Sequence, residues 1–170
     1  KDLTGTILRG ADLTDANLTG IDLSDRDLTG TVLRGMDLSD KDLTGTILTG
    51  ADLTDANLTG VDLFGKDLTG ANLTRVDLSG KDLTNSILTY ANLDNADLSN
   101  ANLTNAAFLA VDLTKIKNKS LVGTNIISAS FSGSNLSGVN LSGTTMEVTN
   151  FLETNLTGVD FTAVKNMNFG

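Results

Sequence analysis

The residues of this chain best placed for chemistry are carboxylates that recur every 20 positions. Five aspartates share this spacing: Asp2, Asp22, Asp42, Asp62 and Asp82. If residues 20 apart lie above one another, they form an acidic column that could attract a cationic surface or a cation. Calcium needs about six to eight oxygens that converge on one point, and a straight column does not provide them. We therefore favour a structural role, in which each side chain hydrogen-bonds the backbone of a nearby turn.

The composition argues against several classes of function. The chain has no histidine and no cysteine, so it lacks the commonest general base and any thiolate metal ligand. Serine and threonine are plentiful, but no base is placed to activate one. We expect no enzymatic activity, no cofactor and no metal. The net charge of −9 argues against direct nucleic-acid binding, which needs Lys and Arg. No apolar run approaches the ~20 residues of a membrane helix, so we expect no membrane partner.

A repeat of five residues underlies the spacing of the aspartates. The segment Ala11–Gly20, ADLTDANLTG, contains two copies and returns unchanged as Ala51–Gly60. Its central position is Leu at every fifth residue from Leu3 to Leu113, except at Phe108. The centre and the residue two places before it point the same way in a short strand, and the other residues form a turn. We predict that all centres from Leu3 to Leu113 are buried.

Four such repeats would close a coil of 20 residues, and residues 1–40 and 41–80 are identical at most positions. The unit Ala-(Asp/Asn)-Leu-x-x resembles the consensus of the pentapeptide-repeat proteins, and the resemblance covers almost all of the chain. It implies an all-β fold, a right-handed quadrilateral β-helix of about eight coils. We expect a single domain over residues 1–170.

The resemblance also implies a role. The leading hypothesis is a non-enzymatic rigid scaffold that presents its faces to a protein partner. Some pentapeptide-repeat proteins resemble duplex DNA in width and charge, bind DNA topoisomerases and protect them from inhibitors. The net charge of −9 fits this alternative, an acidic DNA mimic of the gyrase-protecting type. The sequence shows neither a C-terminal dimerising helix nor long loops, which counts against it.

The register of the repeat slips once. The centre after Leu113 is Leu121, eight residues on, which divides the chain into a regular block (1–113), a slip (114–120) and a second block (121–170). We favour a tolerated insertion at a corner over a loop that contacts a partner. The bulge should leave three lysines in solvent: Lys115, Lys117 and Lys119. The resumed register predicts three aromatic rings stacked inside: Phe108, Phe131 and Phe151.

In five repeats the inward position, two residues before the centre, holds a long cation. These residues are Lys1, Arg26, Lys41, Lys66 and Lys81. A buried ammonium without a partner is costly, so we expect the side chains to reach a corner and pair with aspartates there. Asp22 and Asp62 lack an adjacent lysine and should then keep a higher pKa than Asp42 and Asp82.

One side of the coil carries apolar residues where polar ones are expected. Ile7, Ile47 and Ile87 alternate there with Asp27 and Asp67. The same side holds two more apolar residues, Tyr90 and Leu109. A stripe of exposed apolar side chains can mark an interface, but scattered surface hydrophobes are also normal, and the sequence leaves both open.

The sequence does not identify a compartment. The chain opens at Lys1, already in register and without Met, and it shows no signal-peptide pattern. We expect a processed fragment whose targeting signals are missing, and among compartments we favour the cytoplasm.

Overall fold

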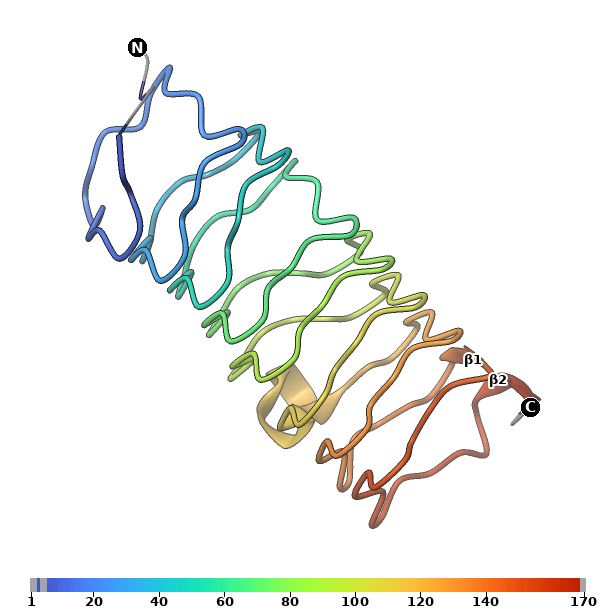
Figure 1. Cartoon of the computed structure of the whole chain (residues 1–170). Coiled ribbons are helices and arrows are strands. Elements are labelled where there is room, and N and C mark those ends of the chain that lie inside the picture. The colour runs from blue at the N-terminus through green and yellow to red at the C-terminus, as the bar shows by residue number, and fades with distance from the viewer. Residues whose placement is uncertain (1–2, 4–5, 169–170) are drawn as a thin grey trace.

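The computed structural model describes residue 3 and residues 6–168. The chain winds into a rod of stacked turns, with its two ends at opposite ends of the rod (Figure 1). Parallel β-bridges join residues 20 apart, such as Asp12 with Val32 and Val32 with Asp52. One turn therefore holds four repeats, and equivalent repeats of successive turns lie in columns. We number the columns by the centres that begin them: Leu3 (first), Leu8 (second), Leu13 (third) and Leu18 (fourth).

Named elements are few, because each repeat contributes only a short extended segment. Two 3-10 helices, η1 (Leu113–Lys115) and η2 (Lys117–Lys119), lie at the slip. Two strands, β1 (Thr145–Glu147) and β2 (Lys165–Asn168), pair in parallel near the C-terminus (Figure 1). Elsewhere the extended segments pair through single β-bridges. None of the helices among the described residues has the length and apolar character needed to cross a membrane.

Most corners are closed by a hydrogen bond from the residue three places after the centre. In one example, the N–H of Ala11 donates to the carbonyl of Leu8 at 2.9 Å. The residue two places after the centre then takes a positive φ, as Gly10 does at 63° and Asp15 at 60°. Glycine, asparagine and aspartate tolerate this conformation best, which explains why they recur at this position.

The repeat centres form the core of the rod. Every centre from Leu23 to Met146 is buried. Fully burying a leucine side chain stabilises the fold by roughly 1.5–3 kcal/mol. Leu3, Leu13 and Leu18 are only half-buried, so the prediction that every centre from Leu3 on is buried was wrong for these three. They belong to the first turn, which has a described neighbour on one side only.

We had predicted an insertion at a corner, but the slip lies inside a repeat. Ile116 is buried and takes the place in its column that Ala96 holds one turn earlier. The hydrogen bond from the N–H of Lys117 to the carbonyl of Ala96 shows this alignment. Ser120 then bridges to Asn140 and restores the register. The extra residues project outward between these two points. The three lysines of the slip are exposed, as predicted: Lys115, Lys117 and Lys119.

Three phenylalanine rings stack in the second column, one before the slip and two after it. The ring centroids of Phe108 and Phe131 lie 5.0 Å apart, and those of Phe131 and Phe151 lie 5.6 Å apart. Both pairs are close to parallel, at 18° and 12°. The predicted register of the second block is therefore confirmed at these positions.

Candidate interaction surfaces

The described aspartates of the acidic column hydrogen-bond their own corners. Asp22 accepts the backbone N–H of Ser24 at 2.9 Å and its hydroxyl at 2.7 Å. Asp42 accepts the backbone N–H of Thr44 at 2.8 Å. Two further members do the same: Asp62 with the N–H of Phe64, and Asp82 with that of Thr84. Asp2 lies outside the described residues. Each of these four carboxylates therefore has a structural task, and a binding role for them remains a prediction.

The corner hydrogen bonds also set the charge of these carboxyls. The hydroxyl and N–H of Ser24 hold the pKa of Asp22 below its ordinary value. Thr44 lowers the pKa of Asp42 in the same way, although the nearby charge of Asp22 opposes it. We had predicted a higher pKa for Asp22 because it lacks an adjacent lysine. That prediction was wrong, because the corner hydrogen bonds outweigh the lysines.

The three inward lysines that the structure describes do not pair with the aspartates of the acidic column, and Lys1 lies outside the described residues. The Nζ of Lys41 donates to the carbonyl oxygens of Leu18 at 2.7 Å and Ile21 at 3.3 Å. The Nζ of Lys66 donates to the carbonyl of Leu43 at 2.6 Å, and that of Lys81 to the carbonyl of Val61 at 3.4 Å. Each of these acceptors lies in the preceding turn. The expected pairing at the corner is therefore wrong for these three lysines, which are half-buried and bond to the backbone.

Lys41 and Lys81 each contact a carbonyl of the kind that otherwise holds neighbouring turns together, those of Ile21 and Val61. In the third column, Asp52 N–H donates to the carbonyl of Thr31 at 2.9 Å, and Leu33 N–H donates to that of Asp52 at 2.8 Å. The equivalent acceptor beneath Lys41 is the carbonyl of Ile21, which takes the ammonium instead. Among the described residues, no main-chain hydrogen bond joins residues 41–48 to residues 61–68.

Grooves lie at the places where these main-chain bonds are missing. The largest, of about 760 Å³, runs between residues 40–47 and 60–67. Smaller ones, of about 450 and 180 Å³, lie between residues 15–20 and 34–41 and between residues 56–60 and 77–81. Each groove includes at least one inward lysine, namely Lys41, Lys66 or Lys81. Sequence reasoning missed these grooves. The sequence feature that could have indicated them is the lysine at the inward position, where the consensus has a small residue.

The apolar residues of the second column are exposed, as predicted. Their exposed fractions are 85% for Ile7, 47% for Ile47 and 39% for Ile87. Tyr90 is 64% exposed, and its N–H donates to the carbonyl of Leu109 in the next turn. These side chains therefore share one side of the rod, and their role as an interface remains a prediction.

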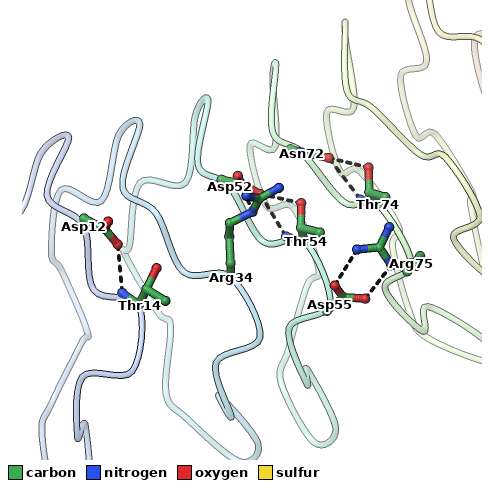
Figure 2. A network of polar contacts seen from close by, with 9 residues as sticks. All are labelled: Asp12, Thr14, Arg34, Asp52, Thr54, Asp55, Asn72, Thr74 and Arg75. Carbon is green, nitrogen blue, oxygen red and sulfur yellow. Dashed lines mark hydrogen bonds and ion pairs between the residues drawn. The ribbon is translucent and has the colours of Figure 1, made fainter.

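The outer surface of the third column is different, because two of its arginines are paired with aspartates (Figure 2). The guanidinium of Arg34 lies 3.1 Å from the carboxylate of Asp52. Arg75 holds Asp55 with two hydrogen bonds, of 2.7 and 2.5 Å. The carboxylates of Asp52 and Asp55 are therefore less available to a partner. In the part of the chain that the structure describes, no group of three or more acidic side chains is arranged to hold a metal ion.

The family model described as "Pentapeptide repeats" matches the chain in eight copies. The matched residues are 1–25, 27–63, 67–105, 114–143 and 124–162. No curated protein sequence matches the chain.

Several solved structures are similar to this one. HetL, a pentapeptide repeat protein involved in heterocyst differentiation regulation from the cyanobacterium Nostoc sp., is 28% identical over 96% of this chain and 71% of its own, with a TM-score of 0.47. A trypsin-treated form of QnrB1, a plasmid-mediated fluoroquinolone resistance protein, is 21% identical over 85% and 78%, with a TM-score of 0.43. The pentapeptide repeat protein Rfr23, from the cyanobacterium Cyanothece, is 29% identical over 66% and 65%, with a TM-score of 0.32.

Proposed function

Because the chain belongs to the pentapeptide repeat family, we propose that it is a non-enzymatic scaffold that presents the sides of its rod to a protein partner. The observation that carries the proposal is the exposed apolar stripe of the second column. The stripe consists of Ile7, Ile47, Ile87 and Tyr90. The aspartates that alternate with the isoleucines accept hydrogen bonds from the backbone of their own corners. Such a stripe is typical of an interaction site.

We further propose the finer architecture: a right-handed quadrilateral β-helix of about eight coils. Bridges between residues 20 apart support it, because 20 residues hold four repeats and 170 residues hold about eight such turns. Far-UV circular dichroism dominated by helix would contradict it.

The scaffold proposal is tested by replacing the stripe with residues that the repeat already uses. In the triple variant Ile47→Asn, Ile87→Asn and Tyr90→Asn, each new side chain suits its position, since asparagine occurs before centres and at positive φ. The control variant is Val122→Thr, which removes an exposed apolar side chain outside the second column. Affinity capture with quantitative mass spectrometry should show partners lost by the triple variant and kept by the control. Equal capture by all three proteins would contradict the proposal.

The second candidate is an acidic DNA mimic that binds a DNA topoisomerase. It is favoured by the net charge of −9 and by the proximity of Asp22 and Asp42 in the first column, where the charge of one carboxylate acts on the other. A gyrase supercoiling assay tests it, with the chain as competitor in the presence and absence of a fluoroquinolone. Inhibition by the wild type but not by Asp22→Asn/Asp42→Asn would favour this candidate over the first.

A further inference from the structure

The groove between residues 40–47 and 60–67 contains the inward side chain of Lys66. Between residues 41–48 and 61–68, the hydrogen bond that connects the two turns runs from Lys66 Nζ to the carbonyl of Leu43. The lysine stem occupies the inward position where most repeats have a small residue. The groove between these turns has a volume of about 760 Å³.

The groove offers main-chain groups as well as side chains. In the third column, the backbone N–H of a repeat centre donates to a carbonyl of the next turn, as the N–H of Leu33 does to the carbonyl of Asp52. The N–H of Leu43 and the N–H of Asp62 have no hydrogen-bond partner within the described chain. Both line the groove. A ligand with peptide groups can complement them, as strands do when they add to an open sheet.

The charge of the groove favours a cation. Four carboxylates line it, those of Asp40, Asp42, Asp62 and Asp67, against two ammonium groups. The ammonium of Lys66 is bound to a carbonyl of the groove wall, and that of Lys41 reaches the preceding turn. The carboxylates hydrogen-bond corner N–H groups but keep acceptor capacity.

Two large apolar side chains lie in the lining and are exposed. Phe64 stands where the repeat has Ser or Thr, and it is 54% exposed. Ile47 belongs to the stripe of the second column and also lines the groove. An aromatic ring next to carboxylates suits an arginine or lysine, whose charged head meets the acid while its stem packs on the ring.

We propose that this groove binds a basic segment of a partner protein, in which arginine or lysine alternates with an aliphatic residue. The cationic groups meet Asp42 and Asp62, the aliphatic side chains pack on Phe64 and Ile47, and the peptide groups face the open backbone of Leu43 and Asp62. This inference rests on the proposed scaffold function and specifies one of its surfaces.

The test uses the full chain and a defined probe, the peptide acetyl-Arg-Leu-Arg-Leu-amide. In titrations followed by NMR, the backbone amides of Gly45, Phe64 and Gly65 should shift, while those of Gly138 and Gly158 should not. The peptide acetyl-Arg-Gly-Arg-Gly-amide keeps the charge but lacks the aliphatic side chains, so it should bind less tightly.

Variants separate specific binding from general charge attraction. Asp42→Asn with Asp62→Asn keeps the corner hydrogen bonds, since asparagine makes them elsewhere, as Asn72 does with Thr74. It should weaken binding about tenfold. The control, Asp12→Asn with Asp160→Asn, changes the net charge equally on other parts of the rod and should leave Kd unchanged. Phe64→Thr should also weaken binding, whereas Leu152→Thr should not.

Three results would overturn the inference: no shifts at millimolar peptide, shifts outside the groove, or equal weakening by both aspartate pairs. The proposed function fails separately. If the peptide occupies the groove but the stripe variants capture the same proteins as the wild type, the scaffold proposal fails and the groove stands. If the stripe variants lose their partners while the groove stays empty, only the groove proposal fails.

Discussion

The ring of Phe131 lies between the rings of Phe108 and Phe151, nearly parallel to both. Phe108 and Phe131 are buried, and the three rings replace leucines at consecutive centres of the second column. This stack spans the turns on both sides of the slip, so it helps to hold the two blocks in register.

Truncation of the middle ring should be costly. Phe131→Ala removes both stacking contacts and leaves a cavity, and we expect a loss of about 3–5 kcal/mol in the free energy of unfolding. Phe131→Leu restores the usual centre and should cost about 1 kcal/mol. Urea denaturation of both variants measures the difference. Similar losses for the two would show that the stack itself, and not the filled volume, stabilises the rod.

The sequence predicted the position of nearly every core residue, because the period of five is strict from Leu3 to Leu113 and resumes at Leu121. It also predicted the stacked rings, since the slip of three residues had one consistent register. It did not predict that Ile116 is buried, because Ile116 is not a repeat centre. The contacts of Lys41 were missed for a physical reason: we considered only carboxylates as partners, and a backbone carbonyl of the preceding turn was within reach of the stem.

Replacing Lys41 should test the link between inward lysines and missing main-chain bonds. In Lys41→Ala, the N–H of Asp42 can donate to the carbonyl of Ile21, as equivalent residues do in the third column. The new backbone bonds should offset the lost ammonium bonds, so we expect stability to change by less than about 1 kcal/mol. Hydrogen exchange at the Asp42 amide should become slower.

The matched variant Lys41→Met keeps the long stem but removes the charge. It should leave the turns apart, so exchange at the Asp42 amide should stay fast. If both variants exchange alike, the stem does not separate the turns.

A single substitution at a corner should stabilise the rod. Val148 has a φ of 51°, a conformation that strongly disfavours a β-branched residue. Val148→Asn should relieve this and raise the free energy of unfolding by about 1 kcal/mol. Val122→Asn is the control, because Val122 is also exposed but does not have a positive φ. Equal effects of the two substitutions would mean that the gain comes from replacing an exposed valine with a polar side chain, and not from the positive φ.

The ion pair at the slip should give a pH dependence. Partial burial raises the pKa of Asp97, but hydrogen bonds from Lys117, at 2.7 Å, and from Ser99 outweigh it and hold the pKa at about 2. A folded-state pKa below the ordinary value of 3.8 contributes stability above about pH 4, and this is lost as the pH falls to about 2. Because Lys117 is largely exposed, we expect a contribution on the order of 1 kcal/mol.

Two lysine variants check this assignment. In Lys117→Met, the carboxyl pKa of Asp97 measured by NMR should rise toward 3.8, and the loss of stability between pH 4 and pH 2 should shrink. The bonds from Ser99 should keep the pKa below that value. Lys115→Met removes only longer ion pairs, of 3.9 and 4.0 Å, and should leave Asp97 unchanged. An unchanged pKa in Lys117→Met would contradict the assignment.

The uneven distribution of main-chain bonds makes the elasticity of the rod depend on direction. In the third column they run without interruption from Ala11 through Thr31, Ala51 and Ala71 to Asn92. In the described first column, only single bonds, from the N–H of Asp25 to Thr44 and from the N–H of Gly65 to Thr84, precede those that begin at Lys81. Tension along the N-terminal half therefore meets a stiff side and a compliant one. The rod should curve with the third column on the inside of the bend, and the largest groove, on the compliant side, should widen first.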